Sequence, residues 1–219
     1  DIGTLTNNST GDVQLSGTND KVSLLDNYGN VSTTNVTAIT TLNNYNNIVL
    51  GGTSNSEVPA DTVDSLKNIT GATLTSNSSN ALFKYVNNAG NIHLSGANDT
   101  IYVLENTNTI DASVKTTFGE NASSSLVNSG TITSEGSTTI VGALTGTGLF
   151  TLNENLRLTG SIAEEQRLTI SNNAILTIET GTLNLNGNDV WAGNVTLTSG
   201  TLNYLDLTSN GVLFAETGD

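Results

Sequence analysis

Carboxylates are the side chains of this sequence best suited to catalysis, and two pairs of them stand close together in the chain. Asp61 with Asp64, and Glu164 with Glu165, have the residue types that glycoside hydrolases use as general acid and as base or nucleophile. Both pairs fall in segments of loop-like composition, where acidic side chains ordinarily only face water. We therefore expect no enzyme, and a glycan lyase or hydrolase is the alternative.

His93 is the only histidine, and the alternating pattern around it places it on the outward face of a strand. A nucleophilic triad or a metal centre needs further groups that converge on the imidazole. We therefore expect a solvated side chain, with no catalytic residue and no metal. The absence of cysteine excludes thiol catalysis, iron–sulfur clusters and cysteine-based zinc sites.

Two hexapeptides, LSGTND at 15–20 and LSGAND at 94–99, resemble part of the calcium-binding nonapeptide GGxGxDxUx. That nonapeptide binds calcium in direct tandem, because adjacent turns share each ion. Here the two copies stand 79 positions apart, Ser replaces the first Gly, and Asn replaces the third. The hexapeptides therefore predict corner turns, and we expect no calcium and no other cofactor.

Candidate binding residues lie outside the regular strand pattern. Trp191 stands between two predicted strands, where its ring could stack on a sugar, although packing across a corner is the commoner role of such a tryptophan. The other candidates are acidic residues of segments in which the strand pattern lapses: Glu57, Asp61, Asp64 and Glu120.

The charge of the chain limits the classes of partner. Its 20 acidic and 6 basic side chains give a formal net charge of −14, which repels a phosphate backbone and excludes nucleic acid. The same charge disfavours an anionic membrane surface, and no apolar run approaches the roughly 20 residues that cross a bilayer. We expect no membrane insertion by this segment. If the parent protein is exported, its targeting segment is expected to precede Asp1.

The sequence repeats itself at several spacings. Residues 7–27 return as residues 87–106, and eight aligned positions are each separated by 79. Val13, Val22 and Val31 stand nine positions apart, which is the length of a short strand and its turn. Units of the form Asn-x-Gly-x-Val/Ile begin at Asn27, Asn88 and Asn128, at spacings close to multiples of about 20. Such periods are typical of a stacked array rather than of a globule around a single pocket.

About 20 residues is the size of one rung of a parallel β-helix. We therefore predict an all-β chain folded as a right-handed parallel β-helix, in which asparagines at the corners stack into ladders. An antiparallel β-sandwich built from the nine-residue steps is the alternative. The side chains expected to point inward are Val13, Leu15, Ile92, Leu94, Leu183, Leu185 and Leu202.

Two segments interrupt the strand pattern and are predicted to leave the coil as loops. The first, 53–67, contains the only proline and is expected to hold at most one helical turn; the second is 111–125. Composition does not change along the chain, so we expect residues 1–219 to form a single β-helix segment. Because no capping element follows the last strand, we expect this segment to belong to a longer protein.

Several repeat motifs resemble those of a known family. The Asn-x-Gly-x-Val/Ile units, the run GALTGTG at 142–148, and the Gly-Thr-Leu-x-Leu/Tyr units at 181–185 and 200–204 are similar to passenger-domain repeats of autotransporters, the type V secreted proteins of Gram-negative bacteria. The similarity is loose before residue 120 and firmer after it. It implies a β-helix exported through the outer membrane and exposed on the cell surface or secreted. It carries over no site residue, because passenger repeats are structural.

The resemblance implies adhesion to host cells or bacterial self-association, and hence a virulence role. The partner would be a host cell-surface protein or glycan, or a second copy of the chain, bound by the two loops or by an outward face of the coil. Two other functions stay open, a carbohydrate-active β-helix and a purely structural stalk. An enzyme for acidic polysaccharides would need cations along a groove, and the six basic residues show no repeat in register.

Overall fold

The computed structural model describes residues 1–52, 61–163, 166–170, 175–179, 182–184, 190–192, 194–197, 201–203 and 213–215. These residues form strands and turns and contain no helix, and therefore none that could cross a membrane. The strands belong to a 16-stranded, a nine-stranded and a two-stranded sheet. The predicted all-β class is confirmed.

The nine-stranded sheet contains one short strand from each of nine successive turns of the chain. Its strands are, in spatial order, β2 (Asp12–Leu15), β4 (Asn30–Thr33), β6 (Asn47–Leu50), β8 (Thr73–Ser76), β10 (Asn91–Leu94), β12 (Thr109–Ala112), β15 (Thr131–Ser134), β18 (Leu149–Leu152) and β21 (Arg167–Ile170).

In the 16-stranded sheet, one column of strands runs from β1 to β25, and its first members are the long strands. A second column of short strands begins beside it at β14. The first column is β1 (Ile2–Asn7), β3 (Asp20–Asn27), β5 (Thr37–Asn44), β7 (Asp61–Asn68), β9 (Leu82–Asn88), β11 (Asp99–Asn106), β13 (Thr116–Phe118), β16 (Thr138–Ile140), β19 (Leu156–Leu158), β22 (Ile175–Ile178) and β25 (Asn194–Leu197). The second is β14 (Ser125–Asn128), β17 (Ala143–Thr145), β20 (Ser161–Ile162), β23 (Thr182–Asn184) and β26 (Thr201–Asn203); β24 (Val190–Ala192) pairs with β27 (Leu213–Ala215).

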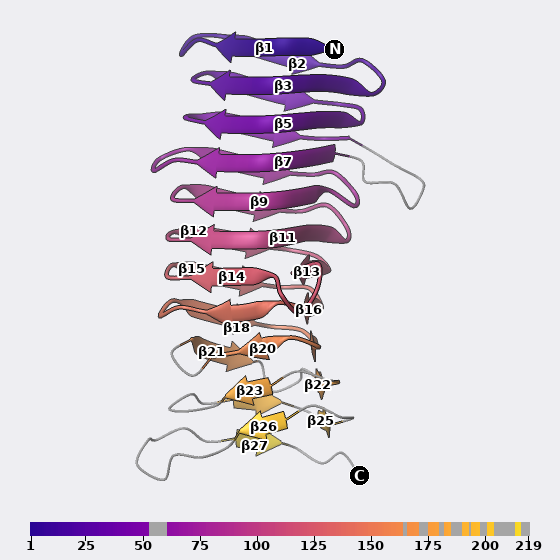
Figure 1. Cartoon of the computed structure of the whole chain (residues 1–219), viewed down its shortest axis with the longest axis vertical. Helices are drawn as coiled ribbons and strands as arrows, with labels where there is room; N and C mark the ends of the chain where they lie inside the picture. The colour runs from indigo at the N-terminus through magenta and orange to yellow at the C-terminus, as the bar shows by residue number, and fades with distance from the viewer. Residues whose placement is uncertain are drawn as a thin grey trace.

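Neighbouring strands of the described chain pair in parallel, each with the strand one turn later, so the chain is a β-helix. In Figure 1 the front strands run to the left and those behind run to the right as the chain descends, which makes the coil right-handed. The predicted β-helix is confirmed, and the antiparallel sandwich is wrong. The nine-stranded sheet spans about nine turns, each of roughly 18 residues. The predicted period of about 20 is slightly long, because it averages this basic rung with rungs that carry insertions.

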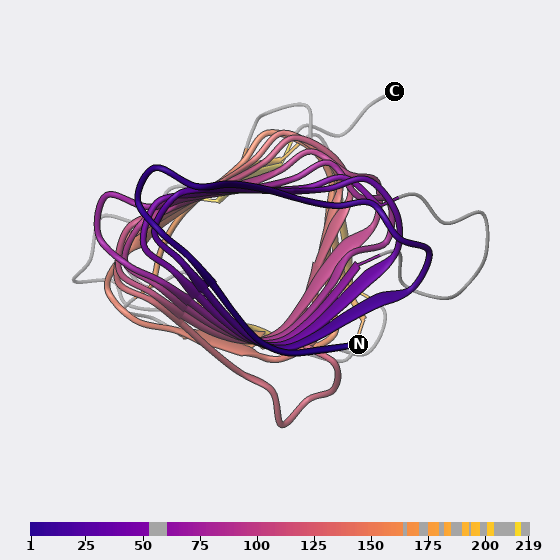
Figure 2. The same ribbon diagram turned by 90° about the horizontal axis from the view of Figure 1, so that it is seen from above.

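The coil changes shape at β11. Its first half pairs with β13 (Asp99↔Thr116) and its second half with β14 (Leu104↔Leu126), so one long strand continues as two separate sides. Residues 119–124, which connect β13 to β14, project from the coil (Figure 2). The later turns therefore have three short strands around a roughly triangular interior (Figure 2).

The interior is filled by one continuous apolar core, to which the repeated apolar residues of the sequence contribute. Leu15, Ile92, Leu94 and Leu183 are buried as predicted, and Val13 is partly buried against the core. Leu185, and the side chain of Leu202, lie outside the described residues. The two copies of the sequence repeat, residues 7–27 and 87–106, occupy equivalent strands of their turns and lie four turns apart.

Parts of both predicted loops are strands of the coil instead. Residues 61–67 are not a loop, because β7 covers them with Val63 and Leu66 buried in the core, and residues 53–60 lie outside the described part. Within 111–125, β12 and β13 continue the coil, and only 119–124 separates strands by more than a short turn. Both misreadings arose because polar residues, including a buried aspartate, obscured the alternation of apolar positions.

Candidate functional site

A file of seven buried asparagines runs through the interior and aligns the turns. Each of the first six donates its side-chain Nδ2 to the Oδ1 of the next at 2.8–3.0 Å. The file ends at Asn128, because the next position is Gly146, which has no side-chain amide to continue it and adopts a φ of 107°. Its members are Asn7, Asn27, Asn44, Asn68, Asn88, Asn106 and Asn128. The predicted asparagine ladder is confirmed.

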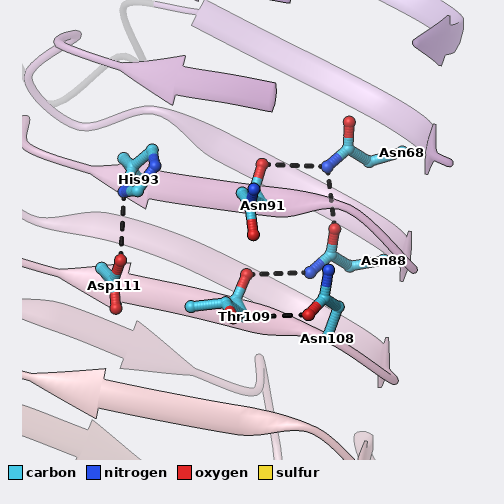
Figure 3. Close-up of polar contacts among 7 residues, drawn as sticks. All are labelled: Asn68, Asn88, Asn91, His93, Asn108, Thr109 and Asp111. Carbon is cyan, nitrogen blue, oxygen red and sulfur yellow. Dashed lines mark hydrogen bonds and ion pairs between the residues drawn. The ribbon is translucent and has the colours of Figure 1, made fainter. Parts of the chain in front are cut away.

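The same amides position the strands of the nine-stranded sheet. Asn68 Nδ2 donates to the backbone oxygen of Asn91, and Asn88 Nδ2 donates to that of Thr109, each at 3.0 Å (Figure 3). Asn91 and Thr109 are the first residues of β10 and β12. The buried ladder therefore fixes where these strands begin and hence the register of their outward side chains.

The outward side chains of β8, β10, β12 and β15 form a flat surface that we call the polar face. Two residues of each strand point outward and two inward, and strand pairing places the outward ones in two files. Parallel strands set their spacing along each file at about 4.8 Å. The polar face is made of Thr73, Thr75, Asn91, His93, Thr109, Asp111, Thr131 and Thr133. It offers hydroxyl, amide, imidazole and carboxylate groups to a partner.

One contact between side chains of adjacent turns lies on the polar face. His93 Nδ1 and Asp111 Oδ2 are 3.2 Å apart, with side chains 43% and 44% exposed (Figure 3). His93 is solvent-exposed as predicted, but it is bound to Asp111, which lies beside it in the next turn. A histidine oriented by an aspartate would need a hydroxyl nucleophile to form a triad. Among the described residues, no hydroxyl hydrogen-bonds to His93.

Two aspartates are buried at the corner that precedes the long strands. Asp61 accepts hydrogen bonds from the Thr37 N–H at 2.8 Å, the Gly52 N–H at 2.9 Å and the Ser78 hydroxyl. Burial raises the pKa of its carboxyl, and these hydrogen bonds oppose the rise. Asp61 therefore joins the backbone of adjacent turns and cannot contact a partner outside the coil.

Asp99 occupies the same corner two turns later, with fewer hydrogen bonds. Its Oδ1 accepts from the Ala81 N–H at 3.0 Å, and its buried Oδ2 has no partner of good geometry among the described residues. Burial raises the pKa of Asp99 to about 7, although the Ala81 N–H and the nearby Ser76 hydroxyl act against the rise. The Asp99 carboxyl is thus poised to hold a proton near neutral pH.

The predicted binding residues are not brought together. Asp61 points inward, whereas Asp64 points outward and pairs with Lys84 at 2.7 Å, so they do not form a carboxylate pair. Glu120 is exposed in the projecting 119–124 turn. Trp191 lies in β24, opposite Phe214 of β27, and its side chain is outside the described part. Glu57, Glu164 and Glu165 also lie outside the described residues.

The hexapeptides that resemble a calcium motif form corner turns. Asn19 and Asn98 adopt left-handed backbone conformations, with φ of 62° and 63°. Asp20 Oδ2 accepts the Gly17 N–H at 2.8 Å, so its carboxylate serves the turn itself. No group of three or more His, Asp or Glu side chains is placed to hold a metal ion within the described part of the chain.

Sequence reasoning did not find the polar face. Its signal was present as polar residues two positions apart, as at Thr73 with Thr75 and Thr131 with Thr133. Aligning these residues between turns requires the lengths of the connecting turns, which vary.

Comparisons with protein-family models, with curated proteins and with solved structures found no match.

Proposed function

We propose that this chain is a non-enzymatic, surface-exposed segment of an autotransporter passenger that acts in adhesion to host cells or in bacterial self-association. The proposal places the interaction on the polar face, with the rest of the coil as an extended support. The partner is a host cell-surface protein or glycan, or a second copy of the chain. The motif resemblance supports the autotransporter assignment, and the parallel β-helix is compatible with it.

The observation that carries the proposal is the low charge of this sheet in a strongly acidic chain. From β4 to β18, the outward residues of the nine-stranded sheet are uncharged apart from Asp111 and any charge on His93. The whole chain has a net charge of −14. Another acidic surface, whether a second copy or a host cell, meets little repulsion at this sheet.

The polar face is also preorganised, which lowers the entropic cost of binding. Its side chains stand on parallel strands whose register the asparagine ladder fixes from behind. Strands hold polar groups more rigidly than loops do, so less freedom is lost when a partner binds. A ladder of donors and acceptors at a fixed spacing suits a repetitive partner, such as a glycan chain or the same face of another copy.

The test adds negative charge to the polar face. A Thr75→Glu/Thr133→Glu variant is compared with Thr62→Glu/Thr100→Glu, a control with the same charge on half-buried outward threonines of the larger sheet. Host-cell binding is measured by flow cytometry and self-association by sedimentation velocity. We expect the face variant to lose at least about tenfold in one assay while the control keeps its binding.

Three outcomes would contradict the proposal. Equal losses for the two variants would indicate a general charge effect rather than a specific face. Unchanged binding of the face variant would place the contact elsewhere. Cleavage of any glycan presented to the protein would establish an enzyme.

A further inference from the structure

A second surface, on the larger sheet, has different chemistry. A hollow of about 410 Å³ opens over β16, β19 and β22, where Thr139, Arg157 and Thr177 point outward from consecutive turns. Lys115, from the turn before β13, also lines the hollow, as do Asn155 and Ile175. Its volume falls in the lower part of the range of small-ligand sites.

The lining of this hollow contains two cations and no carboxylate. That is unusual for a chain with 20 acidic and only 6 basic residues. Lys115 is exposed and has no ion-pair partner among the described residues. The coil thus brings together two basic residues that are distant in the sequence, which the spacing of the basic residues did not reveal.

Arg157 is held in place while keeping donors for a ligand. Its Nε and Nη2 each donate to Glu179 at 2.7 Å, in the two-point geometry that fixes a guanidinium plane. A guanidinium has five N–H groups, so three are left for another acceptor. Glu179 lies beside the hollow rather than in its lining, and it positions Arg157.

The rest of the lining matches the mixed surface of a sugar. Thr139 and Thr177 flank Arg157 in register, one turn to each side, and supply hydroxyls. Ile175 leaves 43% of its surface exposed, and its N–H is fixed by Asn155 Oδ1 at 2.8 Å. An aliphatic patch beside hydroxyls and cations can contact the C–H face, the hydroxyls and the acid group of one sugar ring.

We propose that this hollow binds a carboxylate-bearing sugar residue of an acidic glycan. The sugar carboxylate accepts hydrogen bonds from Lys115 and from the remaining N–H groups of Arg157. The ring packs on Ile175, and its hydroxyls bond to Thr139, Thr177 and Asn155. This site lies on a different sheet from the polar face, so either proposal can fail while the other stands.

The test measures binding by the 219-residue chain in a calorimeter. The probe is an oligosaccharide of alternating glucuronic acid and N-acetylglucosamine, beside its carboxyl-reduced neutral form, a sulfated oligosaccharide and a poly-glutamate peptide. We expect the carboxylated sugar to bind most tightly, and its affinity to fall at least about tenfold in Lys115→Ala. Lys84→Ala is the matched control, because it removes the same charge from an exposed lysine of β9.

Each remaining outcome would overturn the proposal. Equal binding of the neutral oligosaccharide would show that the carboxylate is not recognised. Equal or tighter binding of the sulfated sugar or of poly-glutamate would make the hollow a general anion site or a peptide site. Equal losses in Lys115→Ala and Lys84→Ala would reduce the effect to net charge. Failure of all four probes to bind would remove the site. Thermal melts confirm that both variants fold.

Discussion

Asn88 donates its side-chain Nδ2 to the Oδ1 of Asn106 at 2.8 Å, and both side chains are buried. Asn88 also accepts from Asn68 and donates to the backbone oxygen of Thr109 (Figure 3). One amide therefore connects three turns and both principal sheets. Because these amides are buried, the loss of one would leave the hydrogen-bonding groups of its neighbours unpaired, so the ladder should be sensitive to the loss of any one member.

Replacement of Asn88 by alanine should lower the free energy of unfolding by about 2–4 kcal/mol, because it removes the partners of buried groups on both sides of it. The measurement is a urea titration followed by circular dichroism. Asn87→Ala is the control, since the Asn87 side chain points outward and its hydrogen bond to Glu105 is exposed. Similar losses of unfolding free energy in both variants would show that the burial of the ladder does not determine how much it stabilises the fold.

The two faces of β10 make a second test. Leu94 is fully buried, so Leu94→Asp places an unpaired charge in the core and should cost about 3 kcal/mol or more. His93→Ala removes only a half-exposed contact with Asp111, which is worth about 1 kcal/mol or less. Thermal melts compare the two variants. Equal shifts would mean that the inward and outward sides of this strand are reversed.

The close approach of successive turns at the corners makes a third test. A Cβ on Gly96 would lie 1.6 Å from the backbone oxygen of Ser78, so Gly96→Ala must displace the neighbouring turn. We expect a loss of at least about 2 kcal/mol in urea titrations. Gly3→Ala serves as control, because nothing lies within 4 Å of its added Cβ. A neutral Gly96→Ala would show that the corner can widen at little cost.

Much of the fold could be predicted from the sequence, because a coil repeats its pattern in every turn. Asn27 and Asn106, which are 79 positions apart, prove to be in one file with Asn44, Asn68 and Asn88 between them. The apolar alternation similarly identified Ile92 and Leu94 as core residues. The number of residues per turn and the inward-pointing side chains of a strand both follow from the local sequence pattern.

The surfaces could not be predicted in the same way, because they depend on the register between turns. The separations along the ladder vary from 17 to 24 residues, and a shift of one residue would reverse the face of every side chain in a strand. Lys115 and Arg157 could therefore not be placed together from sequence. Asp61 was misread for another reason: its burial depends on hydrogen bonds from Thr37, Gly52 and Ser78 in other parts of the coil.

The last prediction concerns the pH dependence of stability that arises from Asp99. Its pKa is about 7 in the folded chain, against 3.8 for the unperturbed group, so the folded state keeps a proton that the unfolded state has released. The contribution of Asp99 to stability is therefore full below about pH 4, falls as the pH rises to about 7, and is lost above that. Its size is on the order of a few kcal/mol.

Asp99→Asn isolates this contribution, because asparagine resembles the protonated acid in shape and can still accept from the Ala81 N–H. The variant should match the original chain near pH 4 and be more stable than it at about pH 8. Urea titrations at several pH values measure the difference in unfolding free energy between the variant and the original chain. The repulsion among their many acidic groups is common to both chains and cancels in this difference. A difference between Asp99→Asn and the original chain that stays constant from about pH 4 to about pH 8 would show that Asp99 keeps the same charge in the folded and unfolded states.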